Sequence, residues 1–249
     1  MTPLLQKPFL ALAFTALALL PACAQPSAGT ASKAEIEKIV HDYIVAHPEV
    51  VEEALIALGD REKAAKAAAA QAAIKANADK LYRHASDYSI GPANAKVTVV
   101  EFFDYRCGFC KRSVDWVRAL PEEYDGEVRV VFKELPIFGG ISETAALATL
   151  AAGKQGKYLD LHVALMALKN NDDLTEKKID ELAAAAGINV AKMRADMKSR
   201  AVQQQLADMK ALGSALDIGG TPGFFIGDQH IEGANVPAVE AAIEAALKG

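Results

Sequence analysis

Two cysteines, Cys107 and Cys110, carry the clearest chemical signal in the sequence. They lie in the stretch EFFDYRCGFCKRS, residues 101–113. The first residues of this stretch end an apolar, β-branched run that is typical of a buried strand, and the two cysteines follow it. A helix that begins at Cys107 would direct its free N–H groups and its positive dipole end at that sulfur, which favours the thiolate over the thiol. Cys110 would lie one turn further along the same helical face, close enough to attack a mixed disulfide formed at Cys107. The spacing therefore predicts a nucleophilic thiolate followed by a resolving thiol.

Two neighbouring thiols can also hold zinc, form a structural cross-link or bind copper. Zinc needs two further ligands, and the five histidines contain no HxxxH or similar pair, so we predict no zinc centre. A disulfide across two residues constrains little of the unfolded chain and is usually reducible, which disfavours a purely structural bond. Two thiolates also suit Cu(I), a soft metal, and this alternative stays open. The histidines are His41, His47, His84, His162 and His230.

Two charged residues lie where the pattern predicts burial. Glu101 interrupts the apolar run before Cys107, and a carboxylate inside a strand is costly unless it has a partner or a task. Lys133 lies at the end of a second apolar run, and we predict it as the partner of Glu101. The alternative is that both side chains reach solvent at the ends of their strands.

The N-terminus has the layout of a secretory signal peptide, with one lysine, an apolar run over residues 9–20 and then small residues. The apolar run is shorter than a membrane-spanning helix. One prediction is cleavage of residues 1–24, which leaves a soluble exported protein. The other is a lipoprotein signal over residues 1–22, because LPAC resembles a lipobox and would make Cys23 a lipidated first residue. Either outcome leaves one cysteine pair for thiol chemistry in an oxidising compartment.

Residues 32–85 predict a helical segment before the main domain. Ser32 and Glu35 form a capping-box pattern, and Pro48 separates two apolar stripes that short helices cannot bury alone. Residues 61–83 are rich in alanine, which favours a stalk that bridges solvent; packing on the main domain is the alternative. We therefore predict an oligomerisation and stalk segment. The stripes are Ile36, Ile39, Val40, Tyr43 and Ile44, then Val50, Val51, Ala54, Leu55 and Leu58.

Residues 89–249 predict one α/β domain with a helical insertion over about residues 141–216. Two apolar runs, AKVTVVEFFDY and EVRVVFKEL, flank a helix that we expect to break near Pro121, which makes a βαβ unit. A hairpin in GFFIGDQHIEG and a last helix from about Val236 complete the chain. In the insertion we expect helices from about Ser142, over 158–168, between Thr175 and Gly187, and over 193–216.

Three stretches of this domain, VEFFDYRCGFCK, ELPIFGG and GGTPGFFIGDQHIEGA, resemble the DsbA-like branch of the thioredoxin superfamily. The resemblance implies a thioredoxin-like fold, a redox-active disulfide between Cys107 and Cys110, and no other cofactor. It also implies a cis Thr221–Pro222 bond that faces the cysteines, where an extended substrate can pair with the backbone. An ordinary trans turn is the alternative, which the neighbouring glycines permit.

The same resemblance assigns roles to further residues. It implies that Glu101 moves protons for Cys110, and it places Phe109 beside Thr221 and Pro222 on the substrate-binding side. Gly108-Phe109 departs from the Pro-His dipeptide of the strongest oxidant in the family. A phenylalanine cannot stabilise the thiolate as a histidine can, so the oxidising strength stays open.

The segment EIEKIVHDYIVAHPEVVEEAL resembles the N-terminal extension of the copper-sensitivity suppressor C group of DsbA-like proteins. In that group the extension can assemble subunits, and members act as disulfide isomerases or reductants, some linked to copper tolerance. The resemblance implies a periplasmic isomerase or reductase, lipid-anchored if Cys23 is modified. Implied partners are misfolded or disulfide-bonded exported proteins, a membrane redox partner that resets the cysteine pair, and further copies of the chain joined through residues 32–60.

Three alternative functions stay open. One is a dithiol oxidase of newly exported proteins, another is a Cu(I)-binding envelope protein, and the third is a purely structural envelope lipoprotein whose role would not need the two cysteines. The formal net charge of -5 gives no basic footprint for a phosphate backbone, so nucleic acid is excluded as a predicted partner.

Overall fold

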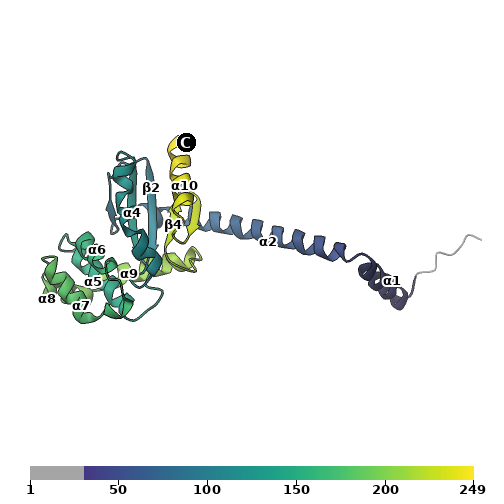
Figure 1. Cartoon of the computed structure of the whole chain (residues 1–249), viewed down its shortest axis with the longest axis horizontal. Coiled ribbons are helices and arrows are strands. Elements are labelled where there is room, and N and C mark those ends of the chain that lie inside the picture. The colour runs from purple at the N-terminus through teal and green to yellow at the C-terminus, as the bar shows by residue number, and fades with distance from the viewer. Residues whose placement is uncertain (1–30) are drawn as a thin grey trace, which may run out of the picture. The chain divides into compact units, whose positions relative to one another are not determined.

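A five-stranded sheet forms the centre of the main domain in the computed structural model, which describes residues 31–249 (Figure 1). The strands lie in the order β1-β3-β2-β4-β5. Neighbours β2 and β3 run parallel, and the other pairs are antiparallel. The strands are β1 (Tyr88–Ile90), β2 (Val97–Phe103), β3 (Val128–Glu134), β4 (Gly223–Ile226) and β5 (Gln229–Glu232). The predicted βαβ unit and hairpin are confirmed, whereas the short β1 was not predicted.

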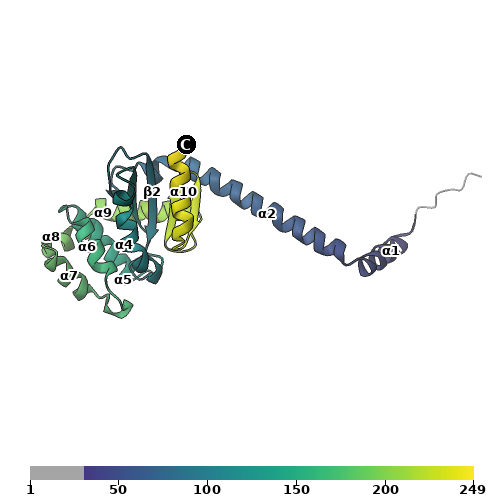
Figure 2. The same cartoon turned by 45° about the horizontal axis from the view of Figure 1, so that its top comes forward.

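Helices make up most of the remaining described chain, and α5 to α8 form a group beside the sheet (Figures 1 and 2). The helices are α1 (Lys33–Ala46), α2 (Glu49–Ala76), α3 (Ala78–Tyr82), α4 (Gly108–Glu123), α5 (Ile141–Gly153), α6 (Tyr158–Met166), the 3-10 helix η1 (Asn171–Asp173), α7 (Glu176–Ala185), α8 (Val190–Met197), α9 (Arg200–Ala215) and α10 (Val236–Lys248). The predicted signal peptide and Cys23 lie outside the described residues.

The central strand β2 is apolar on both faces, because helices cover the sheet on both sides. On one face Val99 and Phe103 join the larger core cluster, which includes apolar residues of α4, α5, α6 and α10. On the other face Val100 and Phe102 join a smaller cluster with residues of α2, α3 and α9. A side chain's position along β2 therefore decides which of the two cores it enters.

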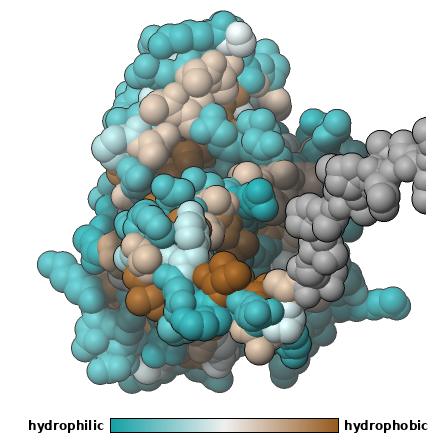
Figure 3. Space-filling view, turned by 90° about the vertical axis from the view of Figure 1, so that its right-hand side faces the viewer, coloured by the Kyte–Doolittle hydropathy of each residue, from teal (hydrophilic) through white to brown (hydrophobic). Residues whose placement is uncertain are grey.

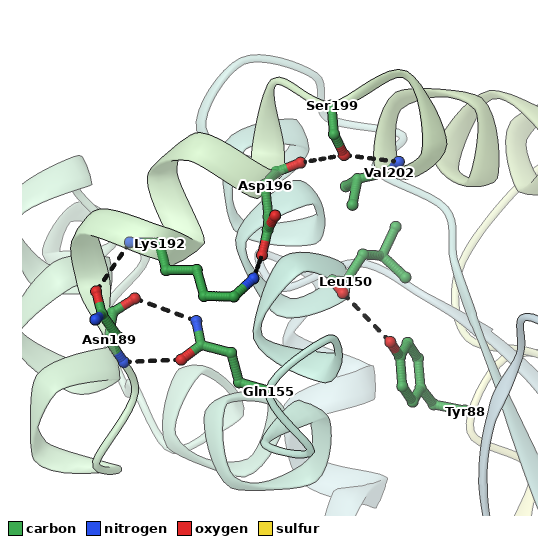
Figure 4. A network of polar contacts seen from close by, with 8 residues as sticks. All are labelled: Tyr88, Leu150, Gln155, Asn189, Lys192, Asp196, Ser199 and Val202. Atoms are coloured by element: carbon green, nitrogen blue, oxygen red, sulfur yellow. Dashed lines mark hydrogen bonds and ion pairs between the residues drawn. The ribbon is translucent and has the colours of Figure 1, made fainter.

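The helical insertion differs from the prediction at one boundary. A single helix over 193–216 was predicted, but α8 ends at Met197 and α9 begins at Arg200. The hydroxyl of Ser199 accepts a hydrogen bond from the N–H of Val202 at 3.4 Å, which caps α9 and separates the two helices. Figure 4 shows this cap.

Polar contacts also fix the start of α8 (Figure 4). Asn189 caps the helix by accepting from the N–H of Lys192 at 2.9 Å. The side chain of Gln155 then hydrogen-bonds both backbone groups of Asn189, at 3.1 and 3.0 Å. Because Gln155 closely follows α5, these bonds tie α8 to α5. The hydroxyl of Tyr88 donates to the carbonyl of Leu150 at 3.4 Å, which ties β1 to α5.

The break expected near Pro121 lies two residues later, because α4 continues to Glu123. A proline lacks the N–H of one intrahelical hydrogen bond, and the helix ends two residues later, so the loss is confined to its last turn.

The described chain divides into two compact units, and the division lies between Ala57 and Leu58. The division lies earlier than the predicted end of the helical segment at residue 85. Ile74 of α2 and Leu81 of α3 explain the difference, because both are buried in the smaller core cluster. The C-terminal part of the alanine-rich stretch therefore packs on the main domain.

The first unit contains α1, whose predicted capping box is confirmed. The hydroxyl of Ser32 accepts from the N–H of Glu35, and the Glu35 carboxylate accepts from the N–H of Ser32 at 2.8 Å. No residue of α1 is buried. On the face of the molecule that Figure 3 draws, hydrophobic residues (brown) reach the surface between hydrophilic ones (teal). The large exposed apolar residues of the N-terminal helices are Ile36, Ile39, Val40, Tyr43, Ile44, Val45, Val50, Val51, Leu55, Ile56 and Leu58.

Candidate active site

Cys107 lies between β2 and α4, at the position that sequence analysis predicted. It is the N-cap of α4, with φ -74° and ψ 113°, and its Sγ accepts a hydrogen bond from the N–H of Cys110 at 3.4 Å. The N–H of Cys107 bonds the carbonyl of Asp104 at 3.0 Å, which closes the turn that leaves β2. The end of the buried strand thus delivers the sulfur to the free N–H groups of the helix.

Hydrogen bonds to its sulfur lower the pKa of Cys107 to about 5. The thiol of Cys110 contributes most, because it donates a hydrogen bond to the thiolate. Burial opposes the effect, whereas the side chain of Thr221 and the N–H groups of Phe109 and Cys110 support it. Cys107 is therefore a thiolate at neutral pH.

Cys110 has the opposite character. It is fully buried in the first turn of α4, and burial raises its pKa strongly, as do its hydrogen bond to Cys107 and the charge of Glu101. Neither cysteine is cross-linked in the structure, so the pair is in its reduced form. At neutral pH the site thus combines one ionised sulfur with one protonated sulfur.

Glu101 lies on the β2 face that carries Val99 and Phe103, the face shared with both cysteines. It is 3 % exposed. Burial, and then the charge of Cys107, raise the pKa of Glu101 to about 8. The carboxyl is therefore largely protonated at neutral pH and close to the point where it can exchange a proton.

The predicted pairing of Lys133 with Glu101 is wrong. In the parallel register Glu101 lies opposite Phe132, and Lys133 lies opposite Phe102, whose side chain is in the smaller core cluster. Since side chains alternate along a strand, Lys133 and Glu101 are on opposite faces of the sheet. Lys133 instead pairs with Asp87 at 2.5 Å, and both of these side chains are 2 % exposed.

The loop before β4 faces Cys107, and its Thr221–Pro222 peptide bond is cis, as the resemblance implied. Sγ of Cys107 lies 3.1 Å from the carbonyl oxygen of Thr221. Pro222 is buried, and its carbonyl accepts from the N–H of Gly233 at 2.8 Å. Phe109, in contrast, is 57 % exposed beside the cysteine pair.

Asp104 holds the turn before Cys107, and sequence analysis did not single it out. Its Oδ1 accepts from the N–H of Arg106 at 2.7 Å and from the hydroxyl of Ser142 at 2.8 Å, and its Oδ2 accepts from the N–H of Phe138 at 3.1 Å. One buried carboxylate thus joins the cysteine turn to the loop between β3 and α5. A charged residue at the end of an apolar strand was the available signal.

A second buried carboxyl, Glu134, was also missed. Its Oε1 accepts from the hydroxyls of Tyr105 and Tyr158, at 3.1 and 3.0 Å. The Tyr105 oxygen also lies 3.2 Å from Nδ1 of His162, and burial lowers the pKa of that histidine to about 3. These four residues come from three separate segments of the chain, so only the fold brings the segments together. Among residues 31–249 no group of three or more His, Cys, Asp or Glu side chains is arranged to hold a metal ion.

Family comparisons agree with this geometry. Residues 83–245, more than half of the chain, match the family model described as Thioredoxin, so the chain belongs to the thioredoxin family. Residues 33–65 match the model described as Copper resistance protein ScsC N-terminal domain. Within the superfamily the chain is a DsbA-like protein that resembles ScsC, and its thioredoxin-like fold is confirmed.

Two solved structures illustrate the resemblance. A linker-deletion mutant of Proteus mirabilis ScsC is 28% identical, with a TM-score of 0.65, covering 89% of this chain and 99% of that one. The thiol-disulfide exchange protein alpha-DsbA2 from Wolbachia pipientis is 27% identical, with a TM-score of 0.65, covering 73% and 98%.

Curated relatives are longer proteins. The Na(+)/H(+) antiporter NhaA 3 of Salinispora tropica is 30% identical over 164 residues, which are 65% of this chain and 25% of that protein. The chain thus spans about a quarter of the length of the curated relatives it matches. Within residues 31–249, no helix has both the length and the apolar character that a membrane span requires.

Proposed function

We propose that the chain is an exported thiol-disulfide oxidoreductase that acts on protein disulfides as an isomerase or reductase through Cys107 and Cys110. The observation that best supports this proposal is that the two cysteines have opposite pKa shifts: the pKa of Cys107 is lowered and that of Cys110 is raised. One sulfur can attack a disulfide at neutral pH, while the other keeps its proton until it is needed.

The reaction begins when the Cys107 thiolate attacks a client disulfide and forms a mixed disulfide. The released client thiolate can then attack elsewhere in the client, which is isomerisation. Alternatively Cys110 loses its proton and attacks Cys107, which completes reduction. Glu101 is the proposed proton acceptor for Cys110, because its pKa near 8 lets it exchange protons around neutral pH. Phe109, Thr221 and Pro222 form the client-facing side.

The isomerase direction is supported by the N-terminal helices. Their apolar residues are exposed in the described chain, and such surfaces favour association. Residues 33–65 match the ScsC N-terminal model. We assign these helices to self-assembly, because several catalytic domains around one client raise the effective concentration of Cys107.

A dithiol oxidase is the second candidate, and the low pKa of Cys107 favours it. A stabilised thiolate stabilises the reduced protein and makes its disulfide a stronger oxidant. A third candidate is a Cu(I) site on the two thiols, because residues 33–65 match a family model whose description names copper resistance. Copper affinity at such a site would require Cys107. The periplasm as location and a lipid anchor at Cys23 belong to the proposal and rest on the sequence of the N-terminus.

The deciding experiment compares two ribonuclease substrates, one scrambled and one reduced. The proposal predicts that the protein reactivates scrambled ribonuclease faster than it oxidises reduced ribonuclease. A variant that lacks residues 32–57 should lose this preference. Sedimentation of both proteins shows whether the deletion also abolishes assembly. Deletion to residue 57 leaves Ile74 and Leu81 in place, so the catalytic unit keeps its core. Rapid oxidation of reduced ribonuclease, with no action on the scrambled form, would favour the oxidase.

A further inference from the structure

A groove lies along α4, directly beside the cysteine pair. It has a volume of about 410 Å³ and begins at Gly108, the residue after Cys107. Helices α4 and α6 lie side by side (Figures 1 and 2), and each supplies part of the lining. The apolar part consists of Val163, Met166 and Leu168 together with Val114. An apolar side chain next to a client cysteine could therefore be buried here.

The charged side chains of the groove are mainly cationic. Lys111, Arg112 and Lys169 line it, against one carboxylate, Asp115. That carboxylate is already paired with Arg118, at 3.7 Å. The whole chain has a formal charge of -5, so this cationic groove departs from the acidic balance of the protein. Such a local excess attracts carboxylates.

Of the two lysines in this set, Lys111 is partly engaged. Its Nζ donates to the side chain of Asn171 at 2.7 Å, and the charges of Asp104 and, more weakly, Asp173 attract it. In the described chain the arginines that form ion pairs are Arg83, Arg118 and Arg194, so Arg112 is not among them. Arg112 and Lys169, both exposed, are thus the cations that a ligand would meet.

Two exposed aromatic rings close to the cysteine turn also have cationic neighbours. The guanidinium of Arg112 lies 4.4 Å from the ring centre of Phe109, which is 57 % exposed. The guanidinium of Arg106 lies 5.7 Å from the ring centre of Phe138, which is 52 % exposed. Cation–π attraction keeps each charge beside its ring. Each pair therefore presents an apolar surface with a positive charge next to it.

We infer that this groove and the neighbouring rings of Phe109 and Phe138 select client segments in which apolar residues and carboxylates flank the reactive cysteine. The inference rests on the proposed function and names the substrate class of the same site. The occupant is an extended segment of an acidic exported protein, and Phe109 with Arg112 forms the contact nearest to the attacked disulfide.

The exchange that tests this inference needs no reagent besides reduced protein and a disulfide peptide. The Cys107 thiolate forms a bond to one peptide sulfur, and the peptide S–S bond breaks to release a thiolate. Cys110 then loses its proton and attacks the Cys107 sulfur, which breaks the mixed disulfide and releases the second peptide sulfur as a thiolate. The proton from Cys110 and one proton from solvent convert the two peptide thiolates to thiols. The protein ends as the disulfide, the peptide as the dithiol, and two electrons have moved to the peptide.

The experiment measures single-turnover rates with synthetic two-cysteine disulfide peptides whose flanking residues are leucine with glutamate, leucine with lysine, or leucine with glutamine. Each rate is divided by that of the same peptide with dithiothreitol, which corrects for intrinsic reactivity. At low salt we expect the glutamate peptide to react about tenfold faster than the lysine peptide. We expect this ratio to fall towards one at about 1 M salt, where screening is nearly complete.

Variants locate the effect. The double variant R112Q/K169Q should lose most of the preference, while R200Q, an exposed arginine on α9 outside the groove, should keep it. Rates with neutral hydroxyethyl disulfide report any change in Cys107 itself. Equal normalised rates for the glutamate and lysine peptides, or a preference that survives R112Q/K169Q, would overturn the inference. Failure of every peptide to react would instead contradict the proposed function.

Discussion

The hydrogen bond between the two thiols yields a quantitative prediction for Cys110 variants. The Cys110 thiol is the largest contribution that lowers the pKa of Cys107 to about 5. A hydrogen bond to a charged group contributes about 1.5–3 kcal/mol. At about 1.36 kcal/mol per pKa unit, its removal raises the pKa of Cys107 by about one to two units, to about 6–7. We therefore predict this rise in Cys110→Ala and a smaller rise in Cys110→Ser, which keeps a hydroxyl donor.

The assay is the ultraviolet absorbance of the thiolate as a function of pH. Among residues 31–249 either variant contains one thiol, so the titration of this part of the chain reports Cys107 alone. Thermal unfolding serves as a control for the packing around this buried position. A Cys107 pKa that stays near 5 in Cys110→Ala would refute the reasoning, because the N–H groups of α4 would then suffice.

Three further predictions follow from the buried charges. Glu101→Gln should slow the resolution of a mixed disulfide by about a hundredfold, because it removes a proton acceptor, while the first attack by Cys107 keeps its rate; rapid-quench kinetics separate the steps. Lys133→Met should lower the free energy of unfolding by about 3–5 kcal/mol and leave the Cys107 pKa unchanged, and adding Asp87→Leu should restore most of the loss in denaturant titrations. The lowered Cys107 pKa stabilises reduced protein fully above the unfolded pKa of 9.0, and this contribution is lost as pH falls towards 5. As pH rises between these limits, the free energy of unfolding of the reduced protein should increase relative to that of Cys107→Ser by about 1.36 kcal/mol per pH unit. A difference that does not change with pH would contradict the lowered pKa.

The sequence was sufficient for features that depend on local patterns. The position of Cys107 follows from a buried strand that ends where a helix begins, and α4 has this arrangement. The capping box at Ser32 is another local pattern that the structure confirms. The cis bond before Pro222 came from the family resemblance, and the structure contains it.

Features that depend on the fold were missed or misplaced. Lys133 was assigned to Glu101 because both interrupt apolar runs, but the register of β2 and β3 decides their faces, and it puts them on opposite sides. The partner, Asp87, belongs to a stretch with no strong pattern before β1. Glu134 was missed for a related reason, since its hydrogen-bond partners come from the β2–α4 turn and from α6.

The most direct test of the account is to trap the mixed disulfide with scrambled ribonuclease. Cys110→Ser should accumulate a covalent complex whose linkage maps to Cys107 by mass spectrometry. Cys107→Ser should form almost none, because Cys110 is buried and its pKa is raised. Comparable trapping through Cys110 in Cys107→Ser, or no complex in Cys110→Ser, would contradict the assignment of Cys107 as the nucleophile.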